Sequence, residues 1–146
     1  MHEVPPCHRA LSPVSECAGR DEAMNGLVLF AHGARDPQWA APFQRLAELV
    51  AAQRPGWRVD LAYLELMTPG LADAVAAQVE AGVSHVTVAP LFLGPGGHLC
   101  RDFPVLMDKL RARYPSVGFD TLPALGESET LLAAIAAWLA GSLPAA

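Results

Sequence analysis

GLVLFAHG, residues 26–33, and VTVAPLFLGPGGH, residues 86–98, are two apolar runs that each lead to a histidine beside a glycine. A short apolar run without a polar helical face is typical of a strand buried on both sides of a sheet. In open parallel sheets, ligands bind beyond the carboxyl ends of the strands. The sequence therefore predicts that His32 and His98 lie at the same functional edge, although they are far apart in the chain.

Strand-like and helix-like segments alternate along the chain after the first run. The expected strands cover residues 26–31, 58–66, 85–91 and 117–122, and the expected helices cover residues 39–53, 69–81, 102–114 and 127–139. Strands separated by helices of this length indicate right-handed crossovers and a parallel sheet. We expect a three-layer α/β domain in which a parallel four-stranded sheet is flanked by helices.

Turn-forming residues set the expected helix boundaries. Thr68 and Pro69 form a good helix start, with Thr68 as the N-cap and Pro69 in the first turn. Gly82 is placed to end that helix. The stretch Asp102-Phe103-Pro104 predicts the start of the next helix, directly after the glycine-rich loop.

The length of 146 residues suits a single domain with a substantial core. Residues 1–23 carry prolines, two cysteines and mixed charges without a helical or strand period, so we expect a flexible leader outside the fold. Met24 directly precedes the first strand, and a start codon there would give a complete domain. We expect the domain itself over residues 24–141, followed by a short tail over residues 142–146.

Composition narrows the class of protein. Hydrophobic residues make up 52% and charged residues 17%, which is typical of a compact globule. No apolar stretch reaches the roughly 18 to 20 residues that span a bilayer, and no signal peptide is evident, so we expect a cytoplasmic protein without a membrane partner. The net charge of −5 without a basic cluster argues against nucleic acid as a partner. The three cysteines form no CxxC pair and are expected to be free thiols.

His32 is the first candidate for chemistry. A lone histidine at a strand end is often a packed residue with backbone hydrogen bonds. Here Gly33 allows a sharp turn and a close approach to a ligand, and Arg35 supplies a cation. Ala31 stands where an Arg-His-Gly phosphohistidine enzyme needs an arginine, which argues against that class. Neutral imidazole is the commonest transition-metal ligand and a proton acceptor near neutral pH.

The second candidate, His98, follows Gly96 and Gly97. Its alternative interpretation is an ordinary loop residue. A glycine-rich turn before a helix can also cradle phosphate, but this one lacks the Lys-Ser/Thr pair of a P-loop. Cys100 is a candidate soft ligand, although no further cysteine completes a zinc site.

Glu65 lies at the end of the second expected strand. An acid within an apolar strand is costly to bury unless it is paired, protonated or metal-bound, and the alternative is a strand end that reaches solvent. Because parallel strands bring their carboxyl ends to one edge, His32, Glu65 and His98 can converge there. Two imidazoles and one carboxylate with open coordination positions suit Co²⁺, Fe²⁺, Ni²⁺ or Zn²⁺.

Several short motifs together resemble a known enzyme family. They are LFAHGARDP (29–37), YLEL (63–66), PLFL (90–93), GH (97–98) and RDFP (101–104). In this order, and within this α/β pattern, they resemble the short, single-domain sirohydrochlorin cobaltochelatases of the early-cobalt-insertion cobalamin pathway. The resemblance extends over about residues 25–140, with Ala34 where the family frequently has a serine.

The resemblance implies ATP-independent insertion of a divalent metal into a tetrapyrrole. It implies catalytic histidines at His32 and His98, which would bind the ion and take protons, with Glu65 as a further ligand or base. The metal would be a substrate, with no prosthetic group: Co²⁺ is expected first, and Fe²⁺ or Ni²⁺ are the alternatives that related enzymes use. The resemblance also implies a symmetric homodimer.

Sirohydrochlorin carries many carboxylates, which need cations and N–H donors on the protein. We expect Arg35, Arg101, Gly96 and Gly97 to bind them. Two other functions use the same residues differently. A metal carrier needs the histidines but no tetrapyrrole-sized cleft, and a phosphate-processing α/β protein uses the glycine loop and is indifferent to His32.

Overall fold

The computed structural model describes residues 23–94 and 96–145, and for residues 97–100 it describes the backbone alone. The elements in chain order are β1 (Met24–Ala31), the 3-10 turn η1 (Pro37–Ala40), α1 (Ala41–Gln53), β2 (Trp57–Tyr63), α2 (Leu71–Glu80), β3 (Val83–Pro90), α3 (Gly97–Arg113), β4 (Gly118–Thr121), the 3-10 turn η2 (Leu125–Glu127) and α4 (Glu129–Ser142). All strand pairs are parallel, in the order β2-β1-β3-β4. The predicted four-stranded parallel sheet is confirmed. Residues 1–22 of the predicted leader lie outside the described residues, and the predicted domain limits stay predictions.

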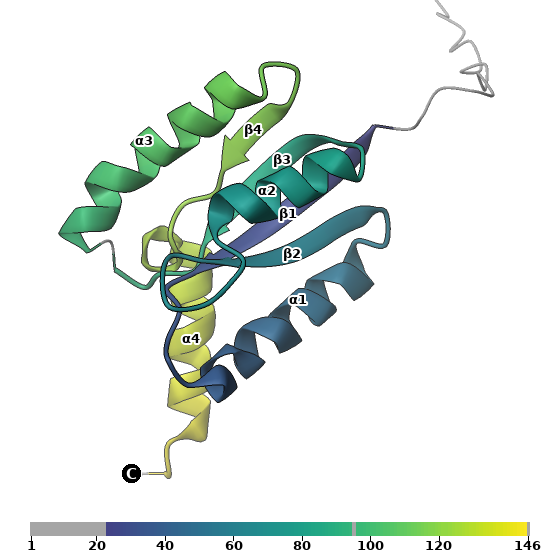
Figure 1. Cartoon of the computed structure of the whole chain (residues 1–146). Helices are drawn as coiled ribbons and strands as arrows, with labels where there is room; N and C mark the ends of the chain where they lie inside the picture. Colours follow the sequence, from purple (N-terminus) through teal and green to yellow (C-terminus); the bar gives the residue numbers. More distant parts are fainter. Residues whose placement is uncertain (1–22, 95, 146) are drawn as a thin grey trace, which may run out of the picture.

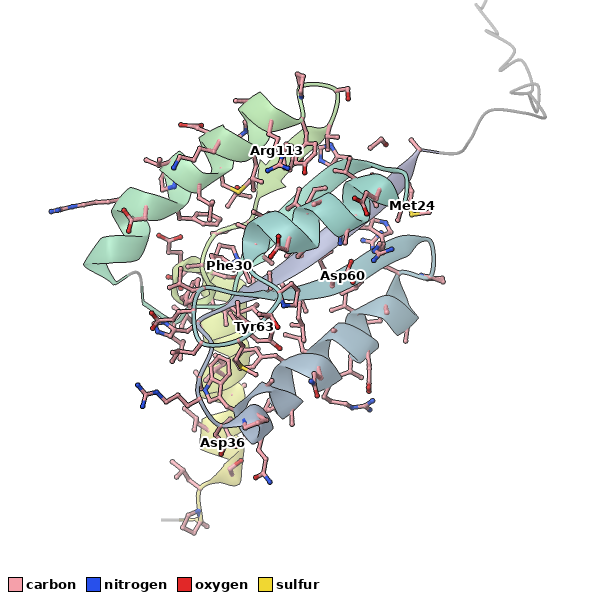
Figure 2. All side chains as sticks on the ribbon, in the orientation of Figure 1. Met24, Phe30, Asp36, Asp60, Tyr63 and Arg113 are labelled. Carbon is pink, nitrogen blue, oxygen red and sulfur yellow. The ribbon has the colours of Figure 1, made fainter. Side chains whose placement is uncertain are left out.

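Helices cover the sheet on both faces (Figure 1). Val28 and Phe30 of β1 pack with Val75 of α2 and Met107 of α3 in the main core. On the opposite face, Tyr63 belongs to a smaller cluster with residues of η1 and α1. Successive residues of a strand point to opposite faces, so the central strand β1 is buried on both sides, as its apolar run requires. Figure 2 shows the side chains that fill these layers, with Phe30 and Tyr63 labelled.

Strand β2 is shorter than predicted and ends at Tyr63 rather than Leu66. The reason is a turn directly after it. Leu66 has a left-handed backbone, with φ of 64°, and the N–H of Met67 donates to the carbonyl of Glu65 at 2.8 Å. The extended conformation therefore cannot continue to the predicted end.

The second helix begins later than predicted, and Thr68 is not its N-cap. The cap is Gly70, and the helix starts at Leu71. Pro69 instead accepts a hydrogen bond of 2.9 Å from the N–H of Tyr63, which ties this segment to the edge of β2. The predicted stop at Gly82 is confirmed, since this residue has a φ of 95°.

Helix α3 begins at Gly97, five residues before the predicted start at Asp102. Pro104 lies inside this helix rather than in its first turn. Proline interrupts the helical hydrogen-bond ladder because it has no N–H. Beyond it, Met107 and Leu110 are buried in the main core, and this packing holds the second half of the helix in place.

Gln78 of α2 is a fully buried polar side chain near the amino end of the sheet. Its Nε2 donates to the carbonyl of Leu27 at 3.1 Å and to Oδ2 of Asp60 at 2.9 Å. Leu27 lies on β1 and Asp60 on β2. One amide therefore connects α2 to two neighbouring strands.

Helix α4 covers neither face of the sheet. Ser128 caps it by accepting a hydrogen bond of 3.2 Å from the N–H of Leu131. The helix packs mainly against η2, and none of its residues is buried. Its last turn extends beyond the layers of the domain (Figure 1). Within the described residues, no helix is both long enough and apolar enough to cross a membrane.

Candidate functional site

The strand order creates a crevice at the carboxyl edge of the sheet. Strands β1 and β3 are the central neighbours. The chain leaves β1 toward α1 on one face, and it leaves β3 toward α3 on the other face (Figure 1). Loops that diverge in this way mark the switch point at which open α/β sheets bind ligands. His32 follows β1, and the glycine-rich loop follows β3.

His32 and Glu65 lie side by side because the ladder between β1 and β2 continues past the strands. Leu64 N–H donates to the carbonyl of Ala31 at 2.9 Å, and Glu65 N–H donates to the carbonyl of His32 at 3.1 Å. The side chains then meet, with 2.9 Å between Nε2 of His32 and Oε1 of Glu65. They are 53% and 55% exposed, so both remain accessible from solvent.

Gly33 allows this close approach of the two loops. Its φ of 94° is in the left-handed region, and a Cβ on it would overlap the carbonyl oxygen of Glu65. A larger residue is therefore excluded by backbone conformation and by space. Gly33, which the sequence marked as a turn residue, is therefore required by the backbone conformation and by the contact with Glu65.

The pair offers one nitrogen and one oxygen donor at a spacing that suits a metal ion. Two ligands bound to one ion at about 2.1 Å and at 90° to 109° are separated by about 3.0 to 3.4 Å. The observed 2.9 Å between Nε2 of His32 and Oε1 of Glu65 needs only a few tenths of an ångström of movement to match. When Nε2 is protonated, the same geometry makes the carboxylate a hydrogen-bond acceptor and an orienting partner of the imidazole.

Phe92 connects this pair to the interior of the domain. Its ring lies edge-on to His32, with ring centroids 6.4 Å apart, and edge-on to Phe30, at 5.7 Å. Phe103 of α3 also stacks with Phe30, with ring centroids 5.7 Å apart. Aromatic packing thus supports the His32 imidazole on one side. Beneath the rim, burial raises the pKa of the Tyr63 phenol.

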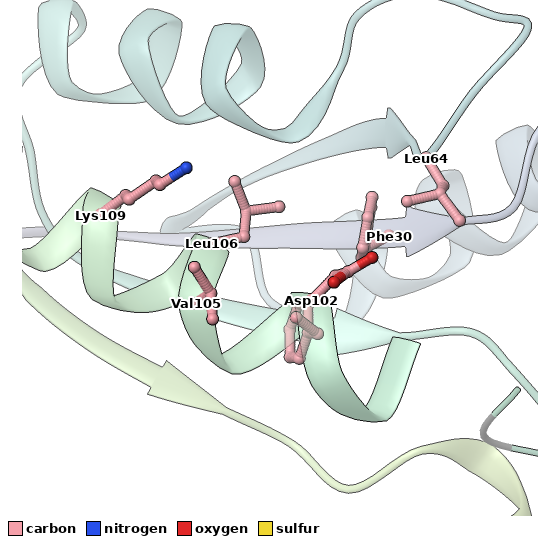
Figure 3. A pocket seen from close by; sticks show the side chains of 7 residues that line it. Phe30, Leu64, Asp102, Val105, Leu106 and Lys109 are labelled. Atoms are coloured by element: carbon pink, nitrogen blue, oxygen red, sulfur yellow. The ribbon is translucent and has the colours of Figure 1, made fainter. Parts of the chain in front are cut away.

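An apolar cleft of about 310 Å³ opens beside the rim, between β1, the end of β2 and α3 (Figure 3). Its lining residues are Phe30, Leu64, Asp102, Phe103, Val105, Leu106 and Lys109. A smaller cavity of about 210 Å³ shares Phe30, Leu64 and Leu106 with it, so the two adjoin. The volume is at the lower end of the range for ligand pockets, about 300 to 1,000 Å³.

The sequence did not assign Lys109 or Asp102 to the site. Both lie on α3 and line the cleft, Asp102 nearer to Phe30 and Leu64 in Figure 3 and Lys109 further along the helix. Their spacing of seven residues places them on one helix face, and this was the available signal. The expected helix over residues 102–114 already contained both residues, but no motif set them apart from the other charged residues of that helix.

The other predicted site residues fall into two groups. The side chain of His98 lies outside the described residues, and its backbone is in the first turn of α3, after the N-cap Gly96 and the first helical residue Gly97. Arg35 and Arg101 are exposed, and no ion pair of either is present in the described part of the chain.

His85 provides an internal comparison for His32. Its Nε2 lies 2.7 Å from Oδ2 of Asp120, so it also forms a histidine–carboxylate pair. His85 is near the start of β3, and therefore far from the carboxyl edge of the sheet. Among the described side chains, no group of three or more metal-ligating residues is assembled.

The fold and the rim define a class of protein: a parallel α/β domain with a histidine–carboxylate pair and an apolar cleft at the switch point of its sheet. The model of the CbiX family matches residues 26–141. This match covers most of the chain. The chain belongs to the CbiX family.

Curated relatives are similar over part of this chain. A sirohydrochlorin cobaltochelatase of Methanopyrus kandleri is 33% identical over 84 residues, which are 58% of this chain and 59% of the relative. One of Saccharolobus solfataricus is 30% identical over 95 residues and is covered to 73%. A chloroplastic sirohydrochlorin ferrochelatase of Arabidopsis thaliana is 25% identical over 126 residues. The chain thus spans about three fifths of the Methanopyrus relative.

Solved structures show the same fold. A cobalamin biosynthesis CbiX protein from Marinobacter aquaeolei VT8 superposes with a TM-score of 0.69 at 32% identity, over 80% of this chain and 95% of that chain. The sirohydrochlorin chelatase SirB of Bacillus subtilis subspecies spizizenii, in complex with cobalt, has a TM-score of 0.68 at 23% identity. That match covers 81% of this chain but only 50% of SirB.

Proposed function

We propose that this protein inserts a divalent metal ion, Co²⁺, into sirohydrochlorin without ATP. The observation that carries the proposal is the pairing of His32 with Glu65, at 2.9 Å, on the switch-point rim beside an apolar cleft. Membership of the CbiX family and the cobaltochelatase names of several relatives support the same reaction.

The first task of the site is to hold the ion without trapping it. His32 supplies an imidazole nitrogen and Glu65 a carboxylate oxygen, and His98, at the start of α3, would supply a second imidazole. A few N and O ligands leave coordination positions open, as in catalytic rather than structural sites. The half-exposed pair can therefore exchange water and pass the ion to the macrocycle.

The second task is to remove two protons. The metal enters as a dication, and the two pyrrole N–H groups lose their protons, so the overall charge balances. Glu65 as a carboxylate and a neutral histidine can each accept a proton within hydrogen-bond reach. The carboxylate that first binds the ion is thus free to act as a base once the ion leaves it.

The third task is to bind a planar, apolar macrocycle with a polycarboxylate rim. The cleft lined by Phe30, Leu64 and Leu106 offers apolar surface for part of the ring. Lys109 at the cleft, with Arg35 and Arg101 on exposed positions, offers cations for the carboxylates. These local cations matter because the protein has a net charge of −5.

A single copy of the cleft is small for a tetrapyrrole, and we include a homodimer in the proposal. The SirB chain is about twice as long as the part that this chain matches, which leaves room there for a second unit of similar size. The cytoplasmic location remains a prediction. Fe²⁺ is the main alternative metal, since one relative is a ferrochelatase and SirB has also been seen with Fe³⁺. Ni²⁺ is the further alternative.

A spectroscopic assay tests the function. Purified protein is mixed with sirohydrochlorin and with Co²⁺, Fe²⁺ or Ni²⁺ in turn, and the absorbance change is compared with the rate without protein. Acceleration with Co²⁺ above the other ions is the expected result. Tight metal binding without any acceleration would overturn the proposal in favour of a metal carrier.

A further inference from the structure

Helix α4 is an apolar element that packs mainly against η2 and covers neither face of the sheet in the described chain. Its exposed large apolar residues are Leu132, Trp138 and Leu139, followed by Leu143 directly after the helix. Trp138 is 69% exposed and Leu139 is 50% exposed. Large apolar side chains gathered on one exposed element mark an interaction surface rather than ordinary scatter.

The charge of α4 is as informative as its exposure. Glu129, in the first turn, is its only charged residue, and no charged residue follows up to the end of the chain. In an isologous contact the same patch meets itself across a two-fold axis, so a charge near the axis would lie close to its own copy. A patch without charges avoids that repulsion.

The chemistry of α4 does not fit a lipid surface. Helices that lie on membranes carry lysine and arginine on their polar face, and α4 has neither. Its 14 residues give a length of about 21 Å, less than the roughly 30 Å of a bilayer core. A second copy of this chain matches the observations better, because the SirB chain is about twice the length that this chain covers.

We infer that α4 is the surface through which two copies of this chain associate, with Trp138 and Leu139 at the centre of the contact. The inference deepens the homodimer proposed above by assigning its surface. Covering α4 removes the largest exposed aromatic side chain of the described structure from water. Aromatic residues at the centre of an interface contribute most to its affinity.

Introducing a charge on α4 tests the assignment. Trp138→Glu and Leu139→Glu are compared with wild type by sedimentation at micromolar concentration. Wild type is expected at twice 15.4 kDa and both variants at 15.4 kDa, with unchanged circular dichroism because α4 contributes nothing buried to the core. Met24→Glu is the matched control, because Met24 is a 38% exposed apolar residue at the amino end of the sheet. This variant should sediment with the same mass as wild type.

Trp138 itself provides a second measurement. The chain has three tryptophans, so Trp39→Phe with Trp57→Phe leaves Trp138 as the only indole. Its fluorescence is expected at short wavelength in the dimer and at longer wavelength after dilution to the monomer. Emission that is independent of concentration while the mass changes would overturn the placement of Trp138 in the contact.

The remaining outcomes separate the inference from the proposed reaction. Wild type at 15.4 kDa overturns both the dimer and its surface. If both variants stay dimeric, the assignment of the contact to α4 is overturned, and the homodimer itself is not. A dimer of the expected kind that inserts no metal overturns the reaction and leaves the surface standing. Co-sedimentation of monomeric wild type with vesicles of phosphatidylcholine and phosphatidylglycerol would assign α4 to a lipid surface and overturn the inference.

Discussion

The carbonyl oxygen of Glu65 occupies the space that a side chain on Gly33 would need. The two residues follow different strands, and their contact sets how closely the loop after β1 approaches the turn after β2. His32 precedes one of them and shares its hydrogen-bond ladder with the other. The donor pair of the site therefore depends on a glycine that itself carries no functional group.

Gly33→Ala is expected to lower the free energy of unfolding by about 2 to 3 kcal/mol, because the methyl group adds both a clash and a strained φ. Metal binding should weaken in the same variant. Chemical denaturation measures the first effect. Gly56→Ala is the control, since nothing lies within 4 Å of a Cβ there, and equal losses in both variants would contradict the steric argument.

His32→Ala and His98→Ala are expected to reduce metal insertion to the rate without protein, and Glu65→Gln to reduce it less. The His32–Glu65 pair is half-exposed, so breaking it should change the free energy of unfolding by less than about 1 kcal/mol. His85→Ala removes the other histidine–carboxylate pair and should leave insertion unchanged. Normal activity without His32 would refute the site.

The affinity for Co²⁺ is expected to rise between about pH 5.5 and 7.5. Protons compete with the ion for imidazole nitrogen, and imidazoles in general titrate near pH 6.5. Lower pH therefore weakens binding and higher pH strengthens it until the competition ends. Calorimetric titration measures the affinity, and His32→Ala should flatten the curve. A wild-type affinity that does not change with pH would exclude histidine ligation.

Lys109→Gln is expected to raise the KM for sirohydrochlorin about tenfold, or about 1.4 kcal/mol, with little change in kcat. The reason is that Lys109 lines the cleft but lies along α3 from the rim, so it would bind substrate without touching the ion. Steady-state kinetics separates the two constants. Arg45→Gln, an exposed cation on α1, is the control. A fall in kcat alone would argue against a carboxylate-binding role.

Leu66→Gly is expected to stabilise the protein by about 1 kcal/mol. Leu66 is 60% exposed and has a left-handed φ of 64°, which costs an ordinary residue about 1 to 2 kcal/mol. Thermal unfolding should show a higher Tm. Leu122→Gly, which replaces an exposed leucine outside the left-handed region, should lower it instead.

The sequence was sufficient for the parallel sheet because its strands are apolar runs between recognisable turns. The approach of His32 to Glu65 could also be anticipated, since parallel strands bring their carboxyl ends to one edge. Both expectations depend on strand direction and order of elements, which local patterns determine well.

Other features depended on contacts that local patterns do not contain. The proline rule placed the start of α3 at Asp102, but tertiary packing of Met107 and Leu110 carries the helix through Pro104. The apolar pattern of α4 likewise resembles that of a helix packed on its own sheet, and only the structure shows that it stands apart.

The buried amide of Gln78 has a consequence for the opposite end of the sheet. It bonds to β1 at Leu27 and to β2 at Asp60, so it fixes how these two strands are aligned. The same alignment, carried along the ladder to Ala31 and Tyr63, decides which residues become neighbours after the strands end. A slip of one residue would turn every following side chain to the other face. The Gln78 amide, which does not contact the proposed metal ion, thus helps to set the distance between the proposed ligands His32 and Glu65.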